Sequence, residues 1–122
     1  MKVKYGEMIS ANEPLSLLSK KEVSIKEAVG IARIIQKLND EFVIYHEKHK
    51  ELLDKYGKPT ENGKYEFDSE EAIKLFNKDY VELLNIEVDL AVDPVKLTSD
   101  IQINAETILL IDKFIDFEEA EG

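Results

Sequence analysis

The chain has 122 residues, a net charge of −10 and no cysteine. This length is typical of one domain, and the missing cysteines exclude disulfides, thiolate metal sites and cysteine nucleophiles. No apolar run approaches the roughly 20 residues that cross a bilayer, and the first residues lack the apolar block of a signal peptide. We therefore expect a single domain over residues 1–122 that stays in the cytoplasm of the cell that makes it, with no membrane partner.

The charge is distributed unevenly along the chain. Residues 1–58 carry 11 Lys/Arg against 9 Asp/Glu, whereas residues 59–122 carry 5 against 17. Nucleic-acid phosphates repel such an acidic half, so we expect no direct binding to DNA or RNA. The acidic residues form either a solvated surface, with residues 118–122 as an acidic frayed tail, or a surface that binds a basic partner.

The first 20 residues predict a strand followed by a short helix. Apolar side chains alternate with lysines from Met1 to Tyr5, which is typical of a strand with one buried face, and Gly6 ends it. Residues 7–20 then hold an apolar set that fits a helix. Because Pro14 has no backbone donor, this helix either begins near Asn12 or is kinked at Pro14.

Residues 24–57 predict one long helix around which the chain is organised. Ser24 and Glu27 form a capping box at its start, and Gly57, which tolerates the left-handed conformation, ends it before Pro59. At 1.5 Å per residue this helix is about 50 Å long. Its apolar positions recur at alternating intervals of three and four, the seam pattern of a coiled coil: Ala28, Ile31, Ile35, Leu38, Phe42, Tyr45, His49, Leu52 and Tyr56.

Two parts of this helix are apolar on more than one side. Gly30 lies in the first part, where small residues allow another backbone to approach closely. Phe42, Val43, Ile44 and Tyr45 form the second part, in which Val43 and Ile44 fall off the seam and require a second partner. The other helices are too short to cover the rod, so we expect a homodimer with Val43 and Ile44 near its centre.

The rest of the chain supplies the partners of this helix. Residues 58–67 are a connector with a turn at Asn62–Gly63, and a capping-box-like start over residues 68–71 opens a helix that runs to about Asn85. A short connector makes this helix antiparallel to the long one. Its apolar stripe consists of Ile73, Phe76, Tyr80 and Leu83.

The last third predicts a strand and a final helix. Apolar residues alternate with mostly acidic ones over residues 86–93, Pro94 interrupts the pattern, and Val95 and Leu97 resume it, which indicates a strand able to pair with residues 1–5. Asn104 is the expected N-cap of a helix that packs on the core through residues 108–117. The predicted fold is mostly α with a minor β part: a long antiparallel helical hairpin with two shorter helices and a small β-sheet.

No residue pattern predicts a reaction. His46 and His49 resemble the zinc helix signature, but their spacing is i, i+3 and a third ligand is not evident. On the seam, a neutral His49 that packs at the helix interface is the ordinary explanation. The glycines form no phosphate loop and no serine sits in a nucleophile elbow. We expect no catalytic residue, cofactor or metal, with a metal-dependent enzyme that uses the two histidines as a competing hypothesis.

Several stretches of the chain form a familiar series of packing and turn signals: residues 1–4, 52–57, 61–64, 76–84, 87–90 and 93–97. Together they resemble a group of small uncharacterised proteins encoded by tailed phages and prophages of low-GC Gram-positive bacteria. The resemblance covers most of the chain except residues 98–107. It implies a phage or prophage setting and carries no activity or site.

We therefore predict a non-enzymatic protein–protein interaction protein that self-associates, accessory to virion assembly or host takeover. A host or phage protein with a basic surface is a further expected partner. The competing hypothesis is an acidic inhibitor of a host nucleic-acid enzyme, such as a nuclease or a CRISPR effector. An exposed apolar patch around Val43 and Ile44 favours self-association, whereas a contiguous acidic face favours the inhibitor.

Overall fold

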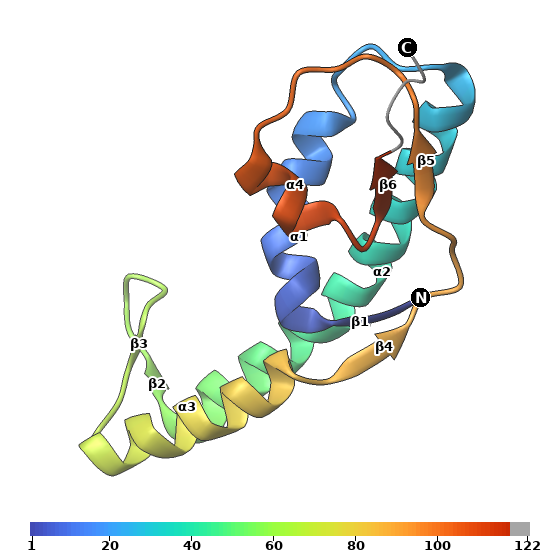
Figure 1. Cartoon of the computed structure of the whole chain (residues 1–122). Coiled ribbons are helices and arrows are strands. Elements are labelled where there is room, and N and C mark those ends of the chain that lie inside the picture. Colours follow the sequence, from blue (N-terminus) through green and yellow to red (C-terminus); the bar gives the residue numbers. More distant parts are fainter. Residues whose placement is uncertain (118–122) are drawn as a thin grey trace.

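The computed structural model describes residues 1–117, so the acidic tail expected at residues 118–122 lies outside the described residues. The fold is mostly α with a minor β part (Figure 1), as the sequence predicts. In chain order the elements are β1 (Lys2–Lys4), α1 (Tyr5–Leu18), α2 (Ile25–Tyr56), β2 (Lys58–Pro59), β3 (Tyr65–Glu66), α3 (Glu70–Leu84), β4 (Glu87–Asp89), β5 (Val95–Leu97), α4 (Ala105–Ile111) and β6 (Ile115–Phe117).

The long helix α2 begins and ends where its capping signals predict. The Ser24 hydroxyl accepts a hydrogen bond from the Glu27 N–H at 3.2 Å, and the Glu27 carboxylate accepts one from the Ser24 N–H at 3.3 Å. The left-handed conformation expected at Gly57 is wrong, because this residue is extended with φ −125° and ψ 177°. Its N–H still binds the Leu53 carbonyl, so the last turn of α2 closes without a left-handed cap.

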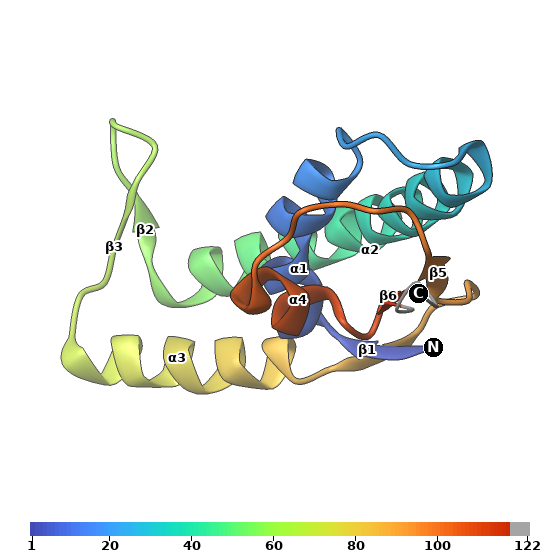
Figure 2. The same cartoon turned by 45° about the horizontal axis from the view of Figure 1, so that its top comes forward.

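Two shorter helices cover the seam of α2 one after the other. In Figures 1 and 2, α1 lies beside the N-terminal half of α2 and α3 lies antiparallel to its C-terminal half. Ile31, Leu38 and Tyr45 are buried along the predicted seam. At its N-terminal end the predicted seam is wrong: Ala28 is exposed and Ile34 is buried instead, on the side of α2 where β5 also packs.

Helix α1 starts earlier than the sequence predicts. It begins at Tyr5 rather than near Asn12, and Pro14 lies inside it. Gly6 belongs to its first turn instead of ending the preceding strand. A Cβ at Gly6 would lie 3.4 Å from the Leu84 carbonyl oxygen, which is an ordinary contact distance, so α1 packs against the end of α3 at this residue.

Within residues 1–117, two of the three two-stranded sheets join distant parts of the chain. β1 and β4 are antiparallel with Val3 opposite Val88, which confirms the predicted pairing of the first strand. β5 and β6 are parallel and were not predicted as a pair. Parallel neighbours need a long crossover, and the segment containing α4 provides it. The predicted last helix is therefore too long, because it ends at Ile111 and the chain continues into β6.

The predicted connector forms a hairpin of β2 and β3. It turns at Gly63, whose φ of 74° favours glycine. Both views show this hairpin standing away from the remainder of the molecule, at the end where α2 and α3 meet (Figure 2). The Tyr65 hydroxyl donates to the Asp54 carboxylate at 2.6 Å and ties the hairpin to α2.

Within residues 1–117, none of the helices has the combination of length and apolar character that spanning a membrane requires.

Candidate interaction surfaces

The predicted interaction residues at the middle of α2 divide between its two sides. Tyr45 is buried and Phe42 is half-buried, and both belong to the core cluster around the seam. Val43 and Ile44 are 67% and 47% exposed. Successive helix residues point about 100° apart, so these two side chains straddle the face of α2 opposite the seam. The structure thus places two branched apolar side chains on a surface that nothing among residues 1–117 covers.

Gly30, the other predicted residue, lies at an internal contact and is half-buried. A Cβ at this position would lie 2.7 Å from a Val95 methyl group, closer than real side chains approach. The close approach predicted for Gly30 is therefore met by β5 of the same chain.

An aromatic cluster holds α3 on α2 directly behind the exposed pair. The Tyr45 and Tyr80 hydroxyl oxygens lie 2.7 Å apart. The His49 ring stacks on the Tyr45 ring with the ring centroids 5.9 Å apart, and it also contacts the Phe76 and Tyr80 rings. Burial, with the hydrogen bond to Tyr80, raises the pKa of Tyr45. Burial and then the charge of His46 lower the pKa of His49. The cluster thus favours a neutral His49.

The two histidines face different surroundings. His49 is half-buried among aromatic rings, whereas His46 is exposed and contacts Phe42 and Tyr45 through its ring. In the part of the chain that the structure describes, no three His, Asp or Glu side chains gather in a way that could hold a metal ion. The seam position of His49 thus agrees with the packing role expected from its spacing.

Glu27 is a buried carboxylate whose second role the sequence did not reveal. It is 5% exposed and, besides Ser24, accepts hydrogen bonds from the Thr98 N–H at 2.9 Å and from the N–H and hydroxyl of Ser99. Burial alone would raise its pKa, but these donors hold the pKa at about 2. The carboxylate therefore fastens the start of α2 to the loop after β5. The capping pattern predicts only its contact with Ser24.

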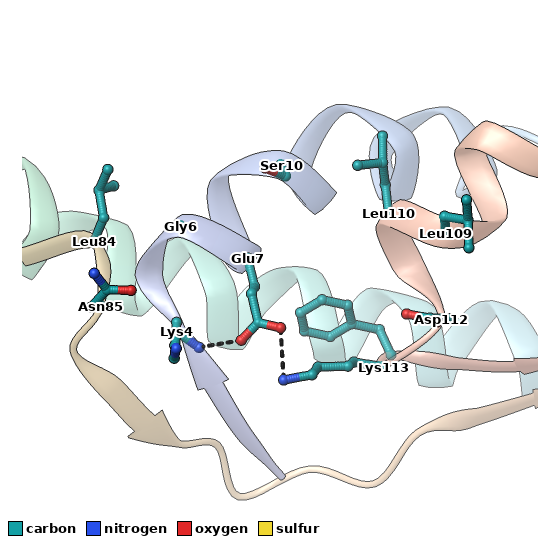
Figure 3. Close-up of a pocket in the computed structure, with 11 residues that line it drawn as sticks. Lys4, Gly6, Glu7, Ser10, Leu84, Asn85, Leu109, Leu110, Asp112 and Lys113 are labelled. Carbon is teal, nitrogen blue, oxygen red and sulfur yellow. Dashed lines mark hydrogen bonds and ion pairs between the residues drawn. The ribbon is translucent and has the colours of Figure 1, made fainter. Parts of the chain in front are cut away.

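A cleft of about 390 Å³ lies between α1, the end of α3 and α4 (Figure 3). Glu7 projects from α1 and forms an ion pair with Lys113 at 2.7 Å, while its other oxygen accepts the Lys4 N–H at 3.0 Å. Burial would raise the pKa of Glu7, but these partners lower it. The cleft thus contains a closed ion pair, bordered by Leu109 and Leu110 of α4.

A larger groove of about 890 Å³ lies between the N-terminal part of α2 and residues 91–98. Val29, Val92 and Pro94 contribute apolar surface, and Lys26 and Arg33 contribute positive charge. The carboxylates of Glu27 and Asp93 also line it, so the groove combines apolar side chains with charges of both signs. Gly30 lies in its wall, where it packs against Val95.

Comparisons with known proteins add no assignment. A scan against protein-family models finds no match, and neither the search of curated proteins nor the search of solved structures finds one.

Proposed function

We propose that this chain is a non-enzymatic protein–protein interaction protein that self-associates through the face of α2 opposite its seam. The observation that carries the proposal is the exposure of Val43 and Ile44 at the middle of the longest helix. The proposal includes a phage or prophage setting, a place in the host cytoplasm, and a role accessory to virion assembly or host takeover.

The polar surroundings of this pair support the proposal. Asp40, Glu41 and Glu47 flank the two apolar side chains along the helix. Burying a fully exposed valine or isoleucine side chain contributes about 1.5–3 kcal/mol. A two-fold dimer uses the same patch on both copies, so each apolar side chain contributes twice. An acidic inhibitor of a nucleic-acid enzyme has no need of such an apolar pair, and the exposed pair therefore favours self-association.

Sedimentation equilibrium at micromolar concentration tests the proposal. We expect the mass of a dimer for the wild type and the 14.0 kDa monomer for the double variant Val43→Glu/Ile44→Glu. The matched control is Leu17→Glu, since Leu17 of α1 is 53% exposed and lies outside α2. All three proteins should stay folded by circular dichroism, and the double variant should melt below the wild type only by the stability that dimerisation adds, a difference that grows with protein concentration. A wild-type monomer at every concentration, or a double variant that stays dimeric, would refute the proposal.

A further inference from the structure

On the exposed face of α2, charged residues lie in pairs at equal distances before and after Ile44, and the two members of each pair carry opposite charges. Asp40 and Lys48 lie about one turn before and after Ile44, and Lys37 and Glu51 lie about two turns before and after it. Residues at these spacings share one side of a helix. All four charged side chains are exposed. We call these residues, with Ile44, the Ile44 stripe.

We propose that two copies of this chain pair through their Ile44 stripes, with the two α2 helices antiparallel and a two-fold axis beside Ile44. This arrangement rests on the proposed self-association and specifies its geometry. Asp40 then lies opposite Lys48 of the partner subunit, and Lys37 lies opposite Glu51 of the partner subunit. The symmetry repeats both pairs, so the stripe is complementary to itself.

Other ways of pairing the helices lose this complementarity. A parallel pair places each charged residue beside its own copy, where like charges repel. An antiparallel pair centred on Val43 instead sets Asn39 opposite Glu47 and Gln36 opposite Lys50, with no pair of opposite charges. Of these three arrangements, therefore, only the antiparallel one centred on Ile44 places opposite charges against each other.

The contacts within one copy are compatible with this pairing. Lys48 lies 3.3 Å from Glu51 of the same helix, and both side chains are more than half exposed. They can exchange this contact for partners across the axis without uncovering a buried charge. The arrangement also brings Glu41 toward Glu47 of the partner subunit, but Glu41 is half-buried and turned toward α1, where it accepts from the Tyr5 hydroxyl.

Cysteine cross-linking tests the position of the axis, because the natural chain has no cysteine. Packed helices lie about 8–10 Å apart with Cα atoms about 2.3 Å from each axis, which leaves about 3.4–5.4 Å between equivalent Cα atoms at the crossing point. The upper part of this range meets the separation of about 4.4–6.8 Å that a disulfide requires. We expect Ile44→Cys to form a covalent dimer at least ten times faster than the control Val43→Cys under copper–phenanthroline. Equal rates, or a faster Val43→Cys, would overturn the proposed axis.

Charge reversal tests the pairing independently of cysteine. Lys48→Glu and Asp40→Lys should each raise the dissociation constant of the dimer at least tenfold, because each reversal turns two attractive pairs into repulsive ones. The double variant Asp40→Lys/Lys48→Glu should return it to within about threefold of the wild type. A dimer whose double variant is no tighter than the single variants would overturn this geometry and leave self-association standing. A wild type that sediments as a monomer would refute both the antiparallel geometry and the self-association.

Discussion

Replacing Glu27 by glutamine should separate its role as a helix cap from its role in holding the start of α2 against the loop after β5. One carboxylate oxygen accepts the N–H and hydroxyl of Ser24 and the Ser99 hydroxyl, and the other accepts the N–H groups of Thr98 and Ser99. A glutamine can turn its carbonyl toward the Thr98 and Ser99 N–H groups and its amide toward the two hydroxyls, which can rotate to accept. The Ser24 N–H then faces an amide donor and keeps only the Ser99 hydroxyl oxygen, 3.3 Å away, as an acceptor.

We expect Glu27→Gln to lower the free energy of unfolding by about 1.5–3 kcal/mol at neutral pH, the range for hydrogen bonds to charged groups. The control Glu22→Gln, at an exposed position shortly before α2, should stay within about 0.5 kcal/mol of the wild type. Urea unfolding followed by circular dichroism gives both values.

The pH dependence of this difference has a defined sign. The donors hold the pKa of Glu27 at about 2 in the folded chain, against 4.5 for a free glutamate, so the unfolded state binds more protons in this interval. The stabilisation is therefore present above about pH 4.5 and is lost as the pH falls toward about 2, at about 1.4 kcal/mol per unit. The gap between wild type and Glu27→Gln should shrink as the pH falls from 5 to 3. A stability difference that is the same at pH 5 and pH 3 would refute the role of the charged Glu27 in holding this loop.

Three further substitutions test the core and the helix interface. Leu38→Ala should cost about 2–5 kcal/mol, since Leu38 is 1% exposed and its truncation leaves a cavity; an unchanged melting temperature would contradict its burial. Gly30→Ala should destabilise by about 1–2 kcal/mol through its clash with Val95 and become neutral or stabilising beside Val95→Ala, as a double-mutant cycle would measure. Because folding lowers the pKa of His49, the neutral imidazole stabilises the fold fully above about pH 6.5, and this stabilisation is lost as the pH falls below that value. His49→Phe should therefore lose less stability than the wild type between pH 7 and 5.

Features with local signals could be predicted from the sequence. The caps at Ser24 and Asn104 need only a hydroxyl or amide oxygen and an N–H three residues later, and both bonds are present. The turn at Gly63 needs one residue with positive φ. The seam of α2 also followed from its spacing, including the half-buried His49. Such features depend on residues within one or two turns of each other.

Features that depend on distant segments could not be predicted. Strand β5 lies within the strand predicted over residues 86–97, but its partner β6 has only three residues, in a segment predicted as helix, and the two pair across a crossover. The acceptor role of Glu27 toward Thr98 and Ser99 depends on a loop 71 and 72 residues further along the chain. The displacement of the seam from Ala28 has the same origin, because strand β5 packs on this part of α2. In each instance the missing information was which segment comes to lie beside α2.

The arrangement of the helices changes the reason for expecting self-association. The long helix was expected to leave uncovered length, since no other helix could match it. In the structure, however, α1 with 14 residues and α3 with 15 follow one another along the 32 residues of α2, so its seam is covered from both ends. The expectation of a dimer therefore rests on Val43, Ile44 and the charges around them, on the face that neither helix covers. Substitutions on that face should change the mass in solution and lower the melting temperature only by the concentration-dependent share that dimerisation adds, whereas substitutions on the seam should lower the melting temperature of the monomer itself. A variant at Val43 or Ile44 that unfolds the monomer would show that this face is part of the core, and the case for a partner would be lost.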